Sequence, residues 1–212
     1  FHTPSTSRAF AVALHRLAWL PGLLAQGPEG ARRALRLIQD WRRVFGTWNA
    51  FSWSGECLER RTFHLACAAK TLSPGASDAE AAALALDVAR GARQLMKASD
   101  APDRALERAV VVTVAGTALV GKAADQLMAE GLRRVARDID AIVLPDGGHA
   151  TRSPEAGLEL LFDLLTLDDA LGQRGRPTPE AISRAIDRLS SGARFFTLAD
   201  GKLAAFHGGE TV

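Results

Sequence analysis

The residues best suited to chemistry lie together in one short loop, between positions 144 and 155. The sequence L-P-D-G-G-H-A-T-R-S-P-E places Asp146, His149 and Arg152 within seven residues, around two adjacent glycines. An imidazole accepts or donates a proton near neutral pH, and a guanidinium binds carboxylates through two parallel hydrogen bonds. The loop therefore predicts a site that recognises anions and moves protons. Turn and cap preferences explain Asp-Gly-Gly and Ser-Pro without chemistry, but they leave His149 and Arg152 without a role.

Most of the remaining sequence predicts amphipathic helices, which must position this loop. Apolar residues recur at three- and four-residue spacing, and breakers such as 73–75 (Ser-Pro-Gly) separate the segments. Paired helices of similar length predict an all-α solenoid or toroid of helical hairpins. We expect helices over residues 29–45, 53–72, 79–96 (capped by Asp78), 104–120, 125–142, 154–167 (capped by Ser153) and 179–196.

The end of the chain changes character. Residues 195–206, F-F-T-L-A-D-G-K-L-A-A-F, place two apolar runs around an Asp-Gly turn and predict a β-hairpin. Two strands alone are only marginally stable, so we expect them to open a further β domain. We divide the chain into a helical domain, 1–194, and the first strands of a following β domain, 195–212. Because the chain begins with Phe1, we also expect it to be a piece of a longer protein.

Composition limits the class of protein. The chain has 212 residues, of which 47% are hydrophobic and 24% charged, as in ordinary soluble domains. It carries 26 basic and 24 acidic residues with no basic run, so we expect no nucleic-acid partner. No apolar run is long enough to span a membrane, so we expect no membrane partner either. Residues 9–24 include His15, Arg16 and Pro21, which argues against a signal peptide and leaves the compartment open.

The cysteines give a weak metal signal. Cys57 and Cys67 lie ten residues apart on one expected helix, roughly 15 Å at the helical rise, which is too far for a disulfide. His64 and Cys67 could share an ion, but two ligands do not make a closed site. We therefore expect buried thiols and no metal.

One run nearly matches a phosphate-binding loop. Residues 110–123 place Gly116, Gly121 and Lys122 at the required spacing, but Ala123 stands where the motif needs Ser or Thr to hold magnesium. We therefore expect this run to be helical and the protein to use no nucleotide cofactor.

A tryptophan-rich segment is the second candidate site. Trp41, Trp48 and Trp53 flank a loop that also holds Asn49, the only asparagine of the chain. Indole rings stack on the apolar faces of sugars, and an amide binds carboxylates or hydroxyls. We therefore take Trp48, Asn49 and Trp53, together with Asp146, as candidate substrate-binding residues. The alternative is a buried corner between two helices.

The order of these features along the chain resembles that of the helical toroid in the heparinase II/III-type and alginate-lyase-type polysaccharide lyases. The resemblance runs from about residue 41 to the end. It implies a bacterial protein of the periplasm or cell envelope, with an incomplete α/α toroid followed by a β-sandwich domain. It also implies an acidic polysaccharide or oligosaccharide as partner, and no cofactor. The segments that carry it are I-V-L-P-D-G-G-H-A-T-R-S-P-E (142–155), L-E-L-L-F-D-L-L-T-L (158–167), residues 185–196, D-G-K-L-A-A-F-H-G (200–208) and the tryptophan-bearing segment 41–61.

Such lyases cleave uronic-acid glycans by β-elimination. The reaction needs a group that neutralises the sugar carboxylate, a base for the C5 proton and an acid for the departing oxygen. The resemblance implies that Arg152 binds the carboxylate and that His149 acts as the base or as a second donor to the carboxylate. Asp146 would orient the loop.

The sequence also departs from the family pattern. The pattern continues R-S-P-x-Y-H, whereas this chain has Ala156 and Gly157 there and contains no tyrosine. The Asn-His pair of an earlier helix has no counterpart near residues 99–108. Two hypotheses stay open: the toroid of a lyase whose other histidines lie in the β domain, or a non-catalytic glycan-binding or helical interaction domain. We expect the chain by itself to be inactive.

Overall fold

The computed structural model describes residues 7–53, 55–98 and 104–207. These residues are mostly helical and confirm the expected all-α fold. The only β pairing among them is two isolated bridges. The helices are α1 (Arg8–Arg16), α2 (Leu20–Leu24), α3 (Gly27–Phe45), α4 (Gly55–Leu72), the short 3-10 turn η1 (Ser73–Gly75), α5 (Asp78–Lys97), α6 (Ala105–Ala118), α7 (Lys122–Ile142), α8 (Pro154–Gln173) and α9 (Glu180–Phe196).

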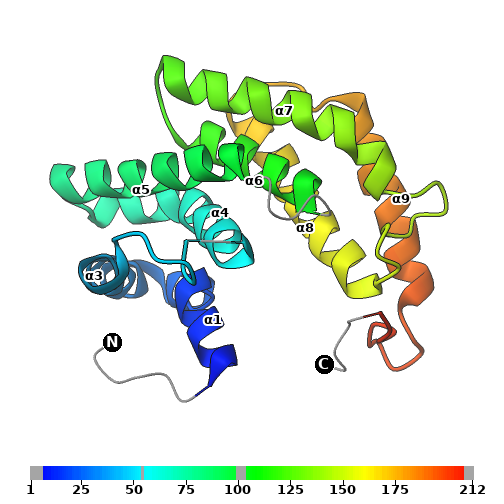
Figure 1. The fold of residues 1–212 in the computed structure, drawn as a ribbon, viewed down its shortest axis with the longest axis horizontal. Helices are drawn as coiled ribbons and strands as arrows, with labels where there is room; N and C mark the ends of the chain where they lie inside the picture. The colour runs from blue at the N-terminus through cyan, green and yellow to red at the C-terminus, as the bar shows by residue number, and fades with distance from the viewer. Residues whose placement is uncertain (1–6, 54, 99–103, 208–212) are drawn as a thin grey trace.

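The helices form two layers that bend into an open arc (Figure 1). Helix α6 contacts α4 on one side and α8 on the other, so these three make one layer. Helices α5, α7 and α9 pack against that layer and make the second. Helices α1 and α3 lie at one end of the arc and α9 at the other. This alternation is the toroid of helical hairpins that the sequence predicts.

Two helix ends differ from the expectation. The cap of α5 is Ser77 and not Asp78, because Ser77 and Glu80 form a reciprocal capping box in which the Ser77 N–H donates to the Glu80 carboxylate over 2.7 Å. Helix α8 continues well beyond Leu167 to Gln173, because Leu171 keeps the buried apolar face going and no breaker precedes Gly175. Helices α1 and α2 lie before residue 25, where the sequence pattern predicts no helix.

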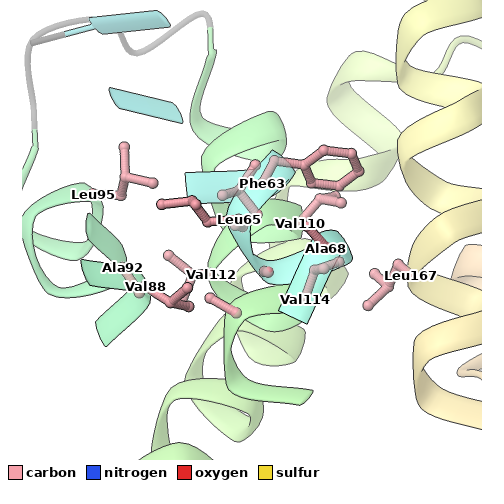
Figure 2. Close-up of a cluster of buried hydrophobic side chains, with 14 of the residues drawn as sticks. Phe63, Leu65, Ala68, Val88, Ala92, Leu95, Val110, Val112, Val114 and Leu167 are labelled. Atoms are coloured by element: carbon pink, nitrogen blue, oxygen red, sulfur yellow. The ribbon is translucent and has the colours of Figure 1, made fainter. Parts of the chain in front are cut away.

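Helix α6 is the centre of the core. Every residue from Leu106 to Gly116 is buried, so this helix has no solvent-facing side. Figure 2 shows Val110, Val112 and Val114 of α6 among side chains of α4 and α5, with Leu167 of α8 nearby. An apolar helix buried on all sides explains why this segment lacks a clear amphipathic pattern.

Helices α6 and α7 pack closely because glycines lie at their contact. A Cβ atom on Gly131 would lie 2.3 Å from Oγ1 of Thr113, and one on Gly116 would lie 2.6 Å from the Met128 nitrogen. Gly116 is therefore a packing residue inside a helix. The run 110–123 is the end of α6 and the turn into α7, and not a phosphate-binding loop.

The C-terminal β-hairpin is shorter than expected. Phe195 and Phe196 belong to α9, and only Thr197 and Leu203 form an antiparallel bridge after it. The Leu198 N–H donates to the Lys202 carbonyl over 2.8 Å and closes the turn. A β domain following the helical one stays a prediction. No helix in the described ranges has the length and apolar character needed to cross a membrane.

Candidate functional site

The 144–155 loop begins as a tight turn that Asp146 helps to build. Val143 and His149 pair as an antiparallel bridge, and the Leu144 N–H donates to the Gly148 carbonyl over 2.9 Å. Oδ1 of Asp146 accepts a hydrogen bond from the Gly148 N–H over 3.0 Å. The exposed Asp146 thus shapes the loop, which is the role we expect for it.

The turn packs directly against α9 at two glycines, Gly147 and Gly192. Gly147 has a φ of +83°, a conformation that costs an L-residue side chain energy. A Cβ on Gly192 of α9 would lie 2.2 Å from the Gly147 carbonyl oxygen, and one on Gly147 would lie 2.3 Å from the Arg188 carbonyl oxygen. Glycine at both positions therefore lets the loop backbone touch the helix.

His149 points inward from this loop. Only 3% of the residue is exposed, and its Nδ1 lies 2.7 Å from Thr151 Oγ1 and 3.2 Å from the Thr151 nitrogen. Because a backbone N–H can only donate, Nδ1 is the acceptor, which assigns the proton of the neutral ring to Nε2. Nε2 lies 3.7 Å from Oε1 of Glu107 in α6, within ion-pair range but too far for a direct hydrogen bond.

The carboxyl group opposite His149 is itself buried. Burial acts to raise the pKa of Glu107, but its neighbours His149 and Arg104 and its own backbone outweigh burial and lower the pKa. Neither Glu107 Oε2 nor His149 Nε2 has a hydrogen-bond partner among the described residues. The imidazole and the carboxyl group therefore face each other, and each keeps one polar atom without a hydrogen-bond partner.

Arg152 points away from the core. Its φ of +62° is strained for a side chain of this size, and its N–H donates to the His149 carbonyl over 2.8 Å. The residue is exposed, and its guanidinium forms no ion pair with any residue that the structure describes. The loop therefore holds a free cationic group toward solvent.

Arg152 borders a groove of about 560 Å³ between the loop and the end of α9. Three phenylalanines line the groove: Phe195 is 82% and Phe206 42% exposed, and the rings of Phe196 and Phe206 meet edge to face at 5.6 Å. This volume lies in the range of small-ligand sites. The groove is lined by Asp146, Gly147, Gly148, His149, Arg152, Ser153, Pro154, Gly157, Leu158, Leu189, Gly192, Ala193, Phe195, Phe196, Phe206 and His207.

A buried network of charges lies behind the loop, and sequence reasoning missed it. Arg60 of α4 donates to Asp163 of α8, with Nη1 at 3.0 Å from Oδ1. Glu59 binds Arg104, whose Nε lies 3.3 Å from Oε2. Arg104 also lies 3.9 Å from Glu107, so the network reaches the partner of His149.

A signal for this network was present in the sequence. Glu107 stands in the apolar segment of α6, and Asp163 stands in the leucine-rich segment 158–167. Charged residues are almost never fully buried unless they are paired. Charges in otherwise apolar helices therefore mark buried partners, although they do not say which residues pair.

The tryptophan-bearing segment lies apart from the groove and lines none of it. Trp48 is 70% exposed. Asn49 is engaged in its own turn, because Oδ1 accepts from the Ser52 N–H over 2.8 Å and Nδ2 donates to Ser52 Oγ over 2.7 Å. Trp53 lies over the guanidinium of Arg61. The structure therefore brings Asp146, His149 and Arg152 together but leaves Trp48, Asn49 and Trp53 elsewhere.

The cysteines differ from the expectation in one respect. Cys57 is buried, but Cys67 is exposed because it faces a hollow between α4, α6 and α8. Nδ1 of His64 lies 2.8 Å from the Arg16 carbonyl oxygen. Within residues 7–53, 55–98 and 104–207, no group of three or more His, Cys, Asp and Glu residues could hold a metal ion.

Comparison with known proteins gives two results that point in different directions. The chain is 68% identical over all 212 residues to FtsZ-localized protein C of Caulobacter vibrioides (strain NA1000 / CB15N), and it spans 37% of the length of that protein. No protein-family model matches the chain.

The solved structures that resemble the chain are lyases. The heparan sulfate lyase HepC from Pedobacter heparinus superposes with a TM-score of 0.65 and 17% identity, over 94% of this chain and 34% of that one. A heparinase III gene product superposes with a TM-score of 0.63 and 16% identity, over 95% of this chain and 36% of that one. The chain therefore has the fold of the helical toroid of the heparinases.

Proposed function

We propose that this chain is a polysaccharide-lyase-type toroid domain that binds an acidic glycan in the groove beside Arg152. The observation that supports this is the guanidinium of Arg152, which has no ion-pair partner among the described residues and lines the same groove as the exposed rings of Phe195 and Phe206. A guanidinium binds carboxylate or sulfate groups through two hydrogen bonds, and an aromatic ring covers the apolar face of a sugar. The groove therefore offers both contacts that an acidic sugar needs.

Calorimetric titration of the full-length protein tests this binding. The ligand is a heparan-sulfate-derived oligosaccharide, and the control ligand is the same oligosaccharide with its carboxyl groups reduced to alcohols. Arg152→Gln should weaken binding about tenfold or more, because a hydrogen bond to a charged group contributes about 1.5–3 kcal/mol. Arg176→Gln alters an exposed arginine outside the groove and should leave the affinity unchanged. Equal affinity of Arg152→Gln and the unaltered protein would refute the groove as the binding site.

We further propose that the full-length protein localises with FtsZ. The support is the 68% identity to a protein whose name states that it is localised with FtsZ. A fluorescent fusion of the full-length protein should co-localise with FtsZ, and a diffuse signal would refute the proposal.

Catalysis by β-elimination is the second candidate. Its support is the imidazole–carboxyl pair of His149 and Glu107, which suits a group that takes up and releases a proton. The burial of His149 and the absence of tyrosine from the chain weigh against it. In this mechanism Arg152 binds the uronate carboxylate and a base removes the C5 proton. The C5–H electron pair then forms the C4–C5 double bond as the C4–oxygen bond breaks, and the departing oxygen takes up a proton. His149 becomes that base once its Nε2 proton has passed to Glu107 and the loop has opened to expose the ring.

Ultraviolet absorbance of the 4,5-unsaturated product tests the second candidate. The full-length protein is incubated with a panel of uronate polysaccharides. A rising signal that is lost in both His149→Ala and Glu107→Gln would support a lyase. A flat signal across the panel, with oligosaccharide binding retained, would refute catalysis and leave the binding function standing.

A further inference from the structure

The tryptophan-bearing segment encloses a buried arginine. Arg61 of α4 is 4% exposed, and its guanidinium carbon lies 4.5 Å from the ring centroid of Trp41 and 5.5 Å from that of Trp53. Nη1 of Arg61 donates to the carbonyl oxygens of His15 and Ser52 over 3.1 and 2.7 Å. Two indole faces and two carbonyl groups therefore surround the cation.

This cation lacks a carboxylate partner. No acidic side chain in the described ranges forms an ion pair with Arg61. The acid that lines the same cavity, Asp87, is already bound by Arg42, whose Nη2 lies 2.7 Å from its Oδ2. Burial lowers the pKa of Arg61 to about 10, against smaller opposing effects of Cys57 and Asp87. The guanidinium thus stays charged at neutral pH in a place where charges are normally paired.

Two hydrogen-bond donors at this place are also unused. Nη2 of Arg61 and Nε1 of Trp53 are both buried, and neither has a partner among the described residues. Both side chains line one small cavity of about 20 Å³, which has room for a single small occupant, a water molecule or a monatomic ion. Neither group can accept a hydrogen bond, so an occupant has to accept from both.

We propose that this cavity is a binding site for one small monovalent anion of the size of chloride. The anion accepts hydrogen bonds from Arg61 Nη2 and Trp53 Nε1 and supplies the missing negative charge. A water molecule could satisfy the two donors but would leave the charge of Arg61 without a counterion. The anion would also tie α1 to α4, because Arg61 already holds the His15 carbonyl at the end of α1.

Halide-dependent stability and anomalous scattering test the site in the full-length protein. Bromide is the probe, and fluoride at the same ionic strength is the comparison, since fluoride is held more strongly by water and fits a chloride-sized site poorly. A ligand that binds only the folded state raises the unfolding midpoint in a saturable way. Crystals grown in bromide should show an anomalous peak between Arg61 and Trp53.

A matched pair of tryptophan variants identifies the cavity. Trp53→Phe keeps the ring and removes the donor, so bromide should bind about tenfold more weakly, as for the loss of one hydrogen bond to a charged group. Trp48→Phe alters an exposed indole away from the cavity and should bind bromide as the unaltered protein does.

Three results would overturn the proposal. The first is the absence of an anomalous peak in the cavity, which would leave water as its occupant. The second is an equal rise of the midpoint in bromide and fluoride. The third is an unchanged bromide response in Trp53→Phe, which would place the anion elsewhere.

Discussion

Replacing Gly192 by alanine tests whether the 144–155 loop rests on α9. The added methyl group would lie 2.2 Å from the Gly147 carbonyl oxygen and 2.9 Å from the carbonyl carbon. Both are backbone atoms, so no side-chain rotation can relieve the contact and the loop has to move. Overpacking of this kind costs about 1–3 kcal/mol and occasionally more. In a helix interior alanine is favoured over glycine by about 1 kcal/mol, which offsets part of that cost.

A 2.2 Å contact with backbone belongs in the upper part of that range, about 2–3 kcal/mol, so the expected net effect of Gly192→Ala is a loss of about 1–2 kcal/mol in the free energy of unfolding. At this chain length that loss corresponds to a melting temperature lower by about 2–8 °C. The matched control is Gly172→Ala in α8, where no atom lies within 4 Å of the new methyl group. The free energy of unfolding of that variant should rise by about 0.5–1 kcal/mol.

The assay is urea denaturation followed by circular dichroism, with oligosaccharide titration as a second measurement. Because the loop carries Arg152, a shift of the loop in Gly192→Ala should also weaken binding in the groove. Gly172→Ala should leave binding unchanged. If Gly192→Ala is stabilised to the same degree as Gly172→Ala, the loop does not rest on α9 and the groove described here is not formed.

Three further predictions concern the helical scaffold. Gly131→Ala should lower the free energy of unfolding by up to about 2 kcal/mol, because overpacking of about 1–3 kcal/mol is offset by about 1 kcal/mol of helix propensity. Its methyl group would lie 2.3 Å from Thr113 Oγ1 and 2.9 Å from the Thr113 backbone nitrogen. A midpoint above the original in urea denaturation would show that α6 and α7 can separate. Ser77→Ala removes a capping box and should cost about 1 kcal/mol, with faster hydrogen exchange in the first turn of α5 and no change in α8. Burial lowers the pKa of His15, so the unfolded state takes up a proton at a higher pH than the folded state does. The free energy of unfolding should therefore be highest above about pH 6.5 and should fall as the pH is lowered below that value. His15→Asn keeps an acceptor for Trp41 and should flatten this loss, and an unchanged slope of unfolding free energy against pH would contradict the assignment.

The helices of this protein could be predicted because their signals are local. Ser153 before Pro154 marks the start of α8, and apolar residues at three- and four-residue spacing mark α3 and α7. The helix ends are harder to predict. The C-terminal end of α8 lies at Gln173, beyond the predicted Leu167, because no strong helix breaker occurs before Gly175. The turn after α9 was overestimated, because Phe195 and Phe196 suit a helix end as well as a strand.

The candidate site was predictable only in part. His149 and Arg152 were found because they lie on one loop, and closeness in sequence places them close in space. The sequence pattern predicts Phe195 and Phe206 as strand residues, whereas in the structure both line the groove. Trp48 and Trp53 were grouped with the loop by chemistry alone, and no local signal could show that they lie outside it.

By itself, the sequence determined the all-α class, most of the helices from residue 29 onward and the turn that carries His149. These follow from periodicity, caps and glycine, which act over a few residues. Only the tertiary structure decided which charges meet. Arg60 and Asp163 are 103 positions apart, and Glu59 and Arg104 are 45 apart. Helical periodicity states which side of a helix is buried, but the partner across the core depends on how the layers stack. The same stacking leaves Arg61 between two indoles with no carboxylate beside it.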